Sequence, residues 1–323
     1  MTRGCHAGRF EDRGVEQMQD MSVTDWQSRM AALGEEFGHY EELGRAHAAL
    51  FSQDAPVLLV TFELRNPLID SDEEGLPLGY RIAQEGGWSS LTLIAEDATW
   101  FRSPEVYAYF DRLVDDGFFE DFDRVVFYGA GSCGYAACAF SVAAPGATVL
   151  AIQPQATLEP LLAGWDDRFP EMRQVSFDDR YGFAPDMMEG AEQGYIIYDP
   201  LERLDAMHAA LFYRPNIKLM PCILAGGRIA SLIARCGQLE LMIARACEGK
   251  LTPRVLRHIY RDCRKNISYT RNLLRAVDAM DRPYMEALVC HHAAVRLKAP
   301  RLRKRYNKLV GELAKKGIIL EQA

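Results

Sequence analysis

The chain has 323 residues, of which 49% are hydrophobic, so it can bury a large core as one big domain or as a domain with an appendage. Its formal net charge is −8, but the charge is unevenly distributed. Residues 250–323 contain 18 Lys and Arg against 6 Asp and Glu, about +12, which leaves 19 basic and 39 acidic residues, about −20, in residues 1–249. This asymmetry predicts a basic C-terminal domain that begins near residue 250.

Several classes of protein are excluded by composition. No apolar run approaches the roughly 20 residues that span a membrane, and the N-terminus has acids where a signal peptide would be hydrophobic. None of the eight cysteines forms a CxxC pair, so we expect neither a metal nor a redox pair, and no cofactor. Reduced thiols in apolar segments are typical of a cytoplasmic protein. The basic charges of the tail are scattered over helical faces, which predicts a solvated surface docked against the acidic body and no nucleic-acid partner.

The N-terminal part of the chain is predicted to be helical. Residues 1–21 are expected to be disordered or a spurious extension, with translation starting at Met18 or Met21. Apolar residues at positions 26, 30, 33 and 37 recur at helical intervals, so we predict a helix over Ser22–Phe51. A loop with an acidic patch at Asp70–Glu74 lies between the first two predicted strands.

Strands and helices alternate from Pro56 to Gly237. Such alternation predicts a doubly wound, mainly parallel α/β sheet with helices on both faces. An irregular, aromatic-rich insertion or lid is expected at Asp166–Pro185 and a short helix near Met187–Glu192. The predicted strands are Pro56–Leu64, Ser90–Asp97, Arg124–Tyr128, Ala147–Pro154, Gly194–Pro200 and Ile217–Leu224.

The C-terminal region is predicted to contain only helices. No strand pattern remains after Gln238, and helices are expected to begin at Thr252-Pro253, near Ile267, at Pro283 and at Pro300. We therefore divide the chain into an N-terminal extension (1–21), an α/β domain (22–249) and a basic helical domain (250–323).

The most informative segment is RVVFYGAGSCGYAACAFSVAAPGATVLAIQP, residues 124–154. It predicts a buried strand, a glycine-rich bend, a helix of small residues, a stop at Pro145-Gly146 and a second buried strand. The bend has three open interpretations: a nucleophile elbow, a dinucleotide-binding loop, or a turn whose glycines serve only close packing.

The first interpretation comes with a family resemblance. YGAGSCGYAACAF followed by PGATVLAIQPQATL resembles the strand–elbow–helix–strand segment of bacterial α/β-hydrolase-like proteins, in which a YGxSxGGYAA pattern leads to a strand that ends in a Pro-Gln pair. The resemblance extends over Pro56 to Gly237. It implies the α/β-hydrolase fold, with the nucleophile at the bend between strand and helix.

The alignment of the bend decides which residue would be the nucleophile. Matching the YG and GY pairs of the two patterns puts Gly131 at the nucleophile position, and glycine has no side chain that can attack. Shifting by one residue makes Ser132 the nucleophile. A shift to Cys133 would require Tyr135 at a position that must be small. We favour the Gly131 alignment.

The resemblance also implies positions for an acid and a base. Asp199 ends the strand that should be followed by the acid. The segment after the last strand, AGGRIASLIARCG, contains no histidine, and His208 is expected to be a partly buried helix residue. Our leading hypothesis is therefore a degenerate elbow that binds a small molecule or a protein partner without catalysis. The alternative is a serine esterase or thioesterase that uses Ser132 and Asp199 with an unidentified base.

The other two interpretations make weaker demands. Gly129, Gly131 and Gly134 spell GxGxxG, but the next strand ends at Gln153, where a dinucleotide site requires an acid. We therefore expect no NAD or flavin. In every case the backbone amides of Ser132 and Cys133 begin a helix and could hold an anion or an acyl oxygen.

Members of the family that the chain resembles often carry the label phosphoadenosine phosphosulfate reductase. That activity implies an SGGxDS-type phosphate loop and a C-terminal ECGxH-type cysteine motif, and this sequence has neither. The run Cys290-His291-His292 lies in an amphipathic helix, where adjacent side chains point about 100° apart and cannot close on one metal ion. The residues do not support the label.

Overall fold

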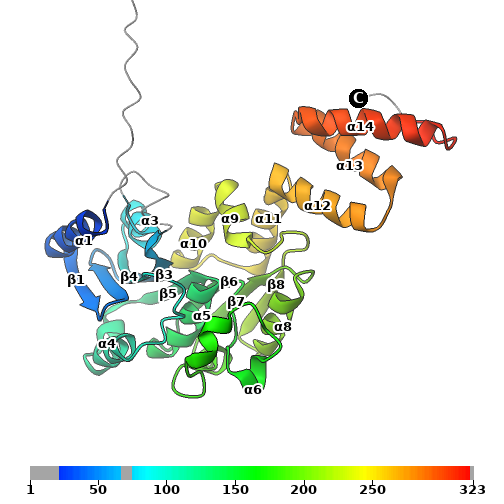
Figure 1. Ribbon diagram of the computed structural model, residues 1–323. Helices are drawn as coiled ribbons and strands as arrows, with labels where there is room; N and C mark the ends of the chain where they lie inside the picture. The colour runs from blue at the N-terminus through cyan, green and yellow to red at the C-terminus, as the bar shows by residue number, and fades with distance from the viewer. Residues whose placement is uncertain (1–21, 67–74, 321–323) are drawn as a thin grey trace, which may run out of the picture.

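The computed structural model describes residues 22–66 and 75–320, so the predictions for residues 1–21 and for the acidic patch at 70–74 lie outside the described part. An eight-stranded sheet with the order β1-β2-β4-β3-β5-β6-β7-β8 forms the centre of the molecule (Figure 1). The β1–β2 and β2–β4 pairs are antiparallel and all other pairs are parallel. The strands are β1 Gly38–Leu43, β2 His47–Ser52, β3 Val57–Leu64, β4 Ser89–Ala95, β5 Arg124–Ala130, β6 Thr148–Ile152, β7 Gln193–Tyr198 and β8 Ile217–Pro221.

The predicted helix over Ser22–Phe51 is wrong beyond residue 37. Helix α1 (Val23–Phe37) ends at Gly38, and the chain then forms the β1–β2 hairpin, which turns at Gly44 with φ +70°. Every residue of β2 is buried, because Ala49 and Phe51 pack into the hydrophobic cluster on one face of the sheet and Leu50 packs into another cluster with α1. Pairing with β4, whose partner residues lie 38 to 48 positions away in the sequence, overrides the helical preference of the alanine-rich segment.

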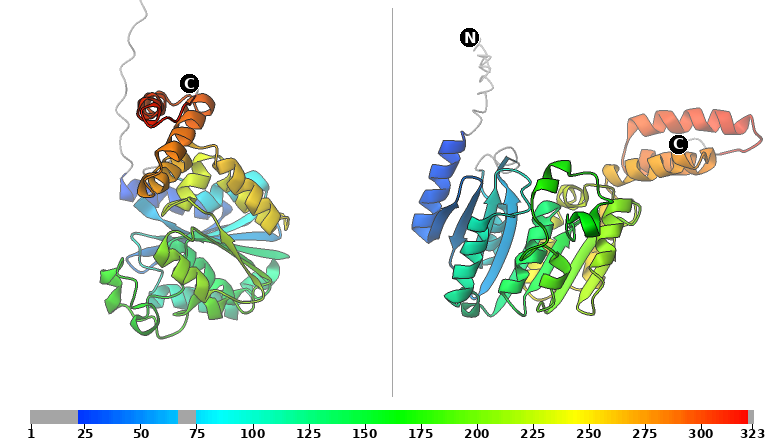
Figure 2. Two further views of the ribbon diagram at one scale, coloured as in Figure 1. Left: turned by 90° about the vertical axis from the view of Figure 1, so that its right-hand side faces the viewer. Right: turned by 60° about the horizontal axis from the view of Figure 1, so that its bottom comes forward.

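Helices cover both faces of the sheet, as the left view of Figure 2 shows. Helices α4, α5, α7 and α8 contribute to the hydrophobic cluster on one face, and α3, α9, α10 and α11 to the cluster on the other. These helices are α3 Leu78–Gly86, α4 Pro104–Asp115, α5 Ser132–Ala139, α7 Ala184–Met187, α8 Arg203–Leu211, α9 Ile229–Arg235, α10 Leu239–Cys247 and α11 Pro253–Cys263. The predicted doubly wound, mainly parallel architecture is confirmed.

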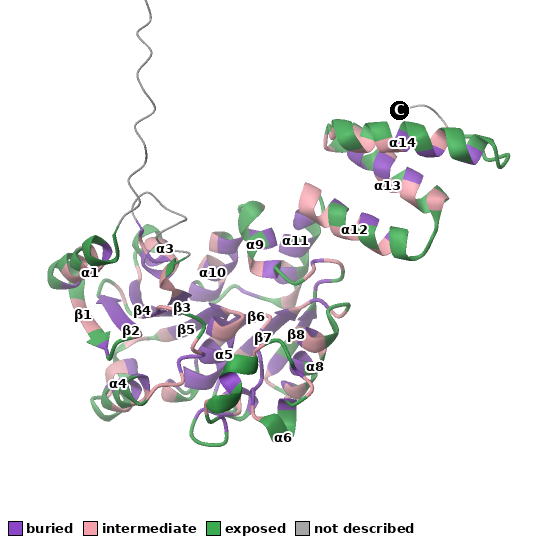
Figure 3. Cartoon of the chain, in the orientation of Figure 1, coloured by how far each residue is buried: buried purple, intermediate pink, exposed green. Residues whose placement is uncertain are grey.

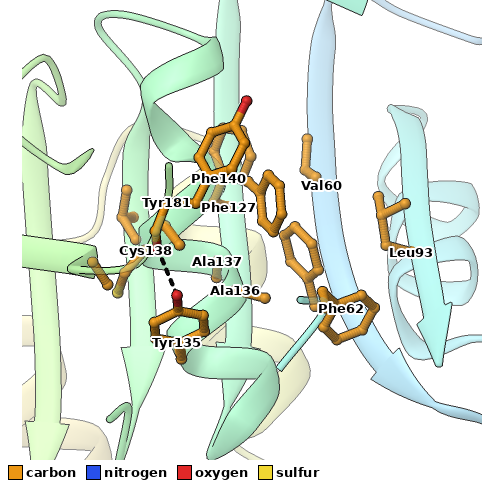
Figure 4. Packing of buried hydrophobic residues seen from close by; sticks show 14 of the residues in the cluster. Val60, Phe62, Leu93, Phe127, Tyr135, Ala136, Ala137, Cys138, Phe140 and Tyr181 are labelled. Atoms are coloured by element: carbon orange, nitrogen blue, oxygen red, sulfur yellow. Dashed lines mark hydrogen bonds between the residues drawn. The ribbon is translucent and has the colours of Figure 1, made fainter. Parts of the chain in front are cut away.

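Helix α5 packs directly against the sheet. Seven of its eight residues are buried, and its small side chains, Ala136 and Ala137 among them, let the helix approach β5, β3 and β6 (Figure 4). Phe140, just after the helix, stacks on Phe62 of β3 with ring centroids 5.6 Å apart. The helix is thereby held against the strand that leads into the bend.

The segment from Asp166 to Pro185 is irregular, as predicted, and packs over α5. It contains only the short 3-10 helix Pro170–Gln174 and the start of α7. The Tyr135 hydroxyl of α5 donates to the carbonyl of Tyr181 at 2.5 Å. The buried Arg102 side chain also donates to the carbonyls of Ser176 and Arg180, and it pairs with Asp179. The helix expected near Met187–Glu192 is misplaced, since α7 ends at Met187.

The C-terminal region is divided by its packing. Residues Leu256, Ile259, Tyr260 and Cys263 of α11 belong to the cluster against the sheet. The remaining helices form a separate cluster and project from the body (Figure 1); they are α12 Ile267–Ala279, α13 Pro283–Arg296 and α14 Pro300–Ala314. Their outer surfaces are exposed (Figure 3). Arg305 pairs with Asp278 and Glu286 of the same region, so the expected docking of the whole tail against the acidic body is wrong for α13 and α14.

The remaining elements are short: α6 Pro160–Ala163 and the 3-10 helices Phe118–Asp121 and Phe140–Ala143. No helix of residues 22–66 and 75–320 is long and apolar enough to cross a membrane.

Candidate functional site: the bend between β5 and α5

Gly131 is the turning point of the bend. Strand β5 ends at Ala130, α5 begins at Ser132, and Gly131 between them has φ 60° and ψ −125°. Its N–H donates to the carbonyl of Ile152 at 2.8 Å. An ideal Cβ built on Gly131 meets no atom within 4 Å. The backbone is therefore in a conformation that L side chains rarely adopt, and it faces open space.

The other two glycines of the bend are required by close packing. A Cβ on Gly129 would lie 2.1 Å from the carbonyl oxygen of Cys133, and a Cβ on Gly134 would lie 3.2 Å from the carbonyl oxygens of Gly129 and Ile152. Both positions have φ outside the left-handed region. These glycines allow the first turn of α5 to touch β5 and β6, which is the role that the packing interpretation gives them.

Ser132 and Cys133 occupy the first turn of α5 and differ in exposure. Ser132 is half-buried, whereas Cys133 is 5% exposed. Burial, and to a smaller extent the nearby Glu63 carboxyl, raise the pKa of the Cys133 thiol to about 12. The thiol is therefore protonated near neutral pH, which removes its nucleophilic character.

Glu63 is a buried acid near the bend that the sequence interpretation did not single out. Its carboxylate accepts hydrogen bonds from the backbone N–H groups of Leu78 and Gly79, both at 2.8 Å, and from the Thr61 hydroxyl at 2.8 Å. Burial raises the pKa of Glu63, and these hydrogen bonds oppose the rise. The signal in the sequence was a single acid inside the apolar run of β3, and it marks the cap of α3.

Asp199 lies just after β7, as the resemblance implies. The side chain is 1% exposed, and its Oδ2 atom accepts from the N–H of Gly226 at 2.7 Å while Oδ1 accepts from the N–H of Leu201 at 3.0 Å. Gly226 belongs to the loop after β8, where the resemblance places the base. The Asp199 carboxylate thus contacts the loop after β8 through a backbone amide.

His208 is held in a separate buried network. Its Nδ1 accepts from the N–H of Ala156 at 3.2 Å, so Nε2 carries the proton and donates to Asp166 at 2.9 Å. Burial lowers the pKa of His208, against the effect of the Asp166 hydrogen bond. Both ring nitrogens are engaged, which confirms the prediction of a buried helix residue, although the ring is fully buried and not partly so.

An arginine completes this network. Burial alone would raise the pKa of Asp166, but hydrogen bonds from Arg168 and His208 outweigh it and lower the pKa to about 2. Arg168 also pairs with Asp205, which in turn accepts from the Gln153 side chain at 2.6 Å. The side-chain oxygen of Gln153 accepts from the N–H of Ile229 at 2.8 Å. Gln153 therefore joins three structural elements at the position where a dinucleotide site would have its acid.

The described residues contain no group of three or more His, Cys, Asp or Glu side chains that could hold a metal ion. The seven cysteines in this part of the chain are free thiols. His291 contacts the ring of Tyr306 with centroids 5.0 Å apart, and Cys290 is fully buried.

Comparisons with known proteins give structural likeness alone. No protein-family model and no curated protein matches the sequence. Solved structures similar to this chain include the carboxylesterase EstE1 from a metagenomic library, with 12% identity, a TM-score of 0.43, and coverage of 71% of this chain and 96% of that one. An esterase of the bacterial hormone-sensitive lipase family has 14% identity, a TM-score of 0.41 and coverage of 73% and 90%. A putative thioesterase from Silicibacter sp. TM1040 has 17% identity, a TM-score of 0.37 and coverage of 62% and 84%.

The strand order, the antiparallel β2 and the sharp bend between β5 and α5 define an α/β-hydrolase-like fold. The expected fold is confirmed. Nothing in the fold or the comparisons supports the phosphoadenosine phosphosulfate reductase label.

Proposed function

We propose that this chain is an α/β-hydrolase-like protein with a degenerate nucleophile elbow, which binds a small molecule or a protein partner without hydrolysing it. The observation that carries the proposal is the backbone of Gly131. This residue has the positive φ that an elbow imposes on its nucleophile, and the space for a side chain is open, but no side chain is present.

The surroundings of the bend support the same proposal. The Asp199 carboxylate is satisfied by two backbone N–H groups, and the loop from Cys222 to Arg228 supplies no imidazole. His208 is the nearest histidine before this loop in the sequence, and both of its ring nitrogens already form hydrogen bonds inside the protein. A serine without its general base loses several orders of magnitude in rate.

The ligand at the bend is proposed to offer an uncharged acyl oxygen. The backbone amides of Ser132 and Cys133, in the first turn of α5, can donate to such an oxygen. The buried Glu63 carboxyl is close enough to raise the pKa of the Cys133 thiol. It would therefore repel an anion bound to the Cys133 amide. A reducing, cytoplasmic compartment belongs to the proposal and is supported by the free buried thiols.

The second candidate is a serine esterase or thioesterase. It is favoured by the position of Ser132, which directly follows the turning residue, is half-buried, and lies on the same edge of the sheet as Asp199. This candidate needs Ser132 as the nucleophile, with a base from outside the residues that contact Asp199.

A fluorophosphonate probe separates the two candidates. We expect no covalent labelling of the full chain under conditions that label an active serine esterase, and no change in Ser132→Ala. Labelling of the wild-type chain that disappears in Ser132→Ala would contradict the proposal and support the esterase. Mass spectrometry of the intact protein measures the outcome, and circular dichroism of both proteins controls for folding.

A further inference from the structure

A cleft of about 660 Å³ opens at the carboxyl ends of β7 and β8, between the loop after β8, helix α9 and helix α12. Its volume lies within the range of small-molecule sites. The carboxyl ends of parallel strands are also where ligands bind in open α/β sheets. Neither Gly131 nor Ser132 lines this cleft, so it is separate from the bend.

Four arginines from two elements line the cleft. Arg228 and Arg235 lie at the two ends of α9, and Arg271 and Arg275, one helical turn apart, come from α12. Among the residues that the structure describes, none of the four forms an ion pair; Arg275 donates to the side-chain oxygen of Asn272 at 3.0 Å. All four side chains are exposed, so their charges are accessible to an anion that enters the cleft from solvent.

Four arginines against two acids, Asp199 and Glu202, leave the lining with a formal charge of +2. Asp199 already accepts two backbone N–H bonds. Glu202 is the other acid in the lining, and it comes from the segment between β7 and α8. Two of the arginines, Arg228 and Arg235, belong to residues 1–249, whose formal charge is about −20, and the other two come from the basic C-terminal region. The local charge of the cleft is therefore opposite to that of the body on which it lies.

Hydrogen bonds join α12, one wall of the cleft, to the loop after β8, which leads into α9 on the other wall. The side-chain amide of Asn272 on α12 donates to the carbonyls of Leu224 and Ala225, at 3.1 and 3.0 Å. The next residue of that loop, Gly226, donates to Asp199. These bonds fix α12 against the loop after β8, so the four guanidinium groups are presented by a preorganised frame.

The chemistry of the lining specifies the ligand. The planar guanidinium fork matches phosphate oxygens, and four forks from two walls exceed what one phosphate can use. No aromatic residue lines the cleft, so a nucleobase would have no side chain on which to stack. We propose that the cleft binds a small molecule that has at least two phosphate groups and needs no aromatic moiety.

Calorimetric titration of the full chain tests this proposal. The probes are inorganic tripolyphosphate and myo-inositol hexakisphosphate, which distinguish a chain of phosphates from phosphates on a carbon ring. We expect binding of at least one probe, weakened about tenfold or more in Arg271→Gln/Arg275→Gln. The matched control is Arg254→Gln/Arg257→Gln on α11, which removes the same charge from exposed residues outside the cleft and should change affinity less than about threefold.

Three results would overturn the proposal. One is the absence of binding to either probe at about 1 mM. Another is equal weakening in the two double variants, which would show attraction to the basic surface as a whole. The third is tighter binding of a single-stranded oligonucleotide than of either probe, which would make nucleic acid the ligand. Arg235→Gln, on the opposite wall, gives the same readout if the α12 variant fails to fold. Fluorophosphonate labelling reports on Ser132 independently of all these outcomes.

Discussion

At the scale of single residues, two glycines of the same bend are present for different physical reasons. Gly131 is needed for its positive φ, and a side chain there would enter open space. Gly129 has an ordinary φ, and a side chain there would collide with the backbone of α5. The sequence shows both as members of one glycine pattern, and only the coordinates separate conformational freedom from close approach.

This difference predicts unequal costs of substitution. Gly131→Ala should lower the free energy of unfolding by about 1–2 kcal/mol, the strain of an L residue in a sparsely populated backbone region. Gly129→Ala should lower it by about 3 kcal/mol or more, because the new Cβ would lie 2.1 Å from the Cys133 carbonyl oxygen and the helix would have to move from the strand. Urea unfolding of the two variants measures both values, and a cost at Gly131 that equals or exceeds the cost at Gly129 would refute this assignment.

At the scale of elements, a buried ionic network joins α8 to the chain after β6. His208 of α8 donates to Asp166, Arg168 bridges Asp166 and Asp205, and Gln153 continues the network to the start of α9. The sequence identified His208 as a helix residue. Its partners were not predictable, because Asp166 lies 42 residues away in a segment without regular structure.

The network predicts a pH dependence of stability. Burial keeps His208 neutral in the folded protein and lowers its pKa below the ordinary value of 6.5, whereas the unfolded chain takes up a proton as the pH falls through 6.5. The contribution of His208 is therefore complete above pH 6.5 and decreases as the pH falls below it. Asp166, with its pKa lowered to about 2, adds stability that is lost only as the pH falls from about 4 towards 2.

The variant His208→Gln isolates this contribution. It should remove the part of the stability loss between pH 7 and pH 5 that comes from the histidine. It should also lower stability at pH 7 by about 1–3 kcal/mol, because the Gln amide does not have the shape to keep the imidazole's bonds to both Ala156 and Asp166. Chemical unfolding at a series of pH values measures both effects. His258→Gln, at an exposed position of α11, is the control. An unchanged pH slope in His208→Gln would contradict the assignment of the proton.

At the scale of the whole molecule, packing and charge divide the chain at different places. The charge asymmetry marks residue 250, but four buried residues of α11 complete the cluster on one face of the sheet. The separate cluster begins with Leu274 of α12. Helix α11 is thus basic on its exposed surface and belongs to the body through its buried face.

Two truncations test this division. A chain that ends at residue 265 should fold cooperatively, whereas a chain that ends at residue 249 should not. Losing the four buried side chains of α11 removes about 6 kcal/mol or more of apolar burial, comparable with the total stability of a domain. Thermal unfolding with near-ultraviolet circular dichroism measures both chains, and cooperative unfolding of the shorter chain would contradict the prediction. The chain that ends at residue 265 also serves in a pull-down experiment, which would show whether protein partners require α12–α14.

The sequence by itself determined the alternation of strands and helices from Pro56 to Gly237, the place of the bend, and the position of Asp199 after its strand. These features depend on the periodicity of apolar residues and on glycine and proline at turns, which act over a few neighbouring residues.

Only the tertiary structure decided the β1–β2 hairpin, the φ of Gly131, the contact between Asp199 and Gly226, and the arginine cleft between α9 and α12. Each of these depends on segments that are distant in the sequence and meet only when the sheet is assembled. A local pattern contains no information about which distant partner will lie beside it, and that partner fixes both the backbone strain and the surrounding charge.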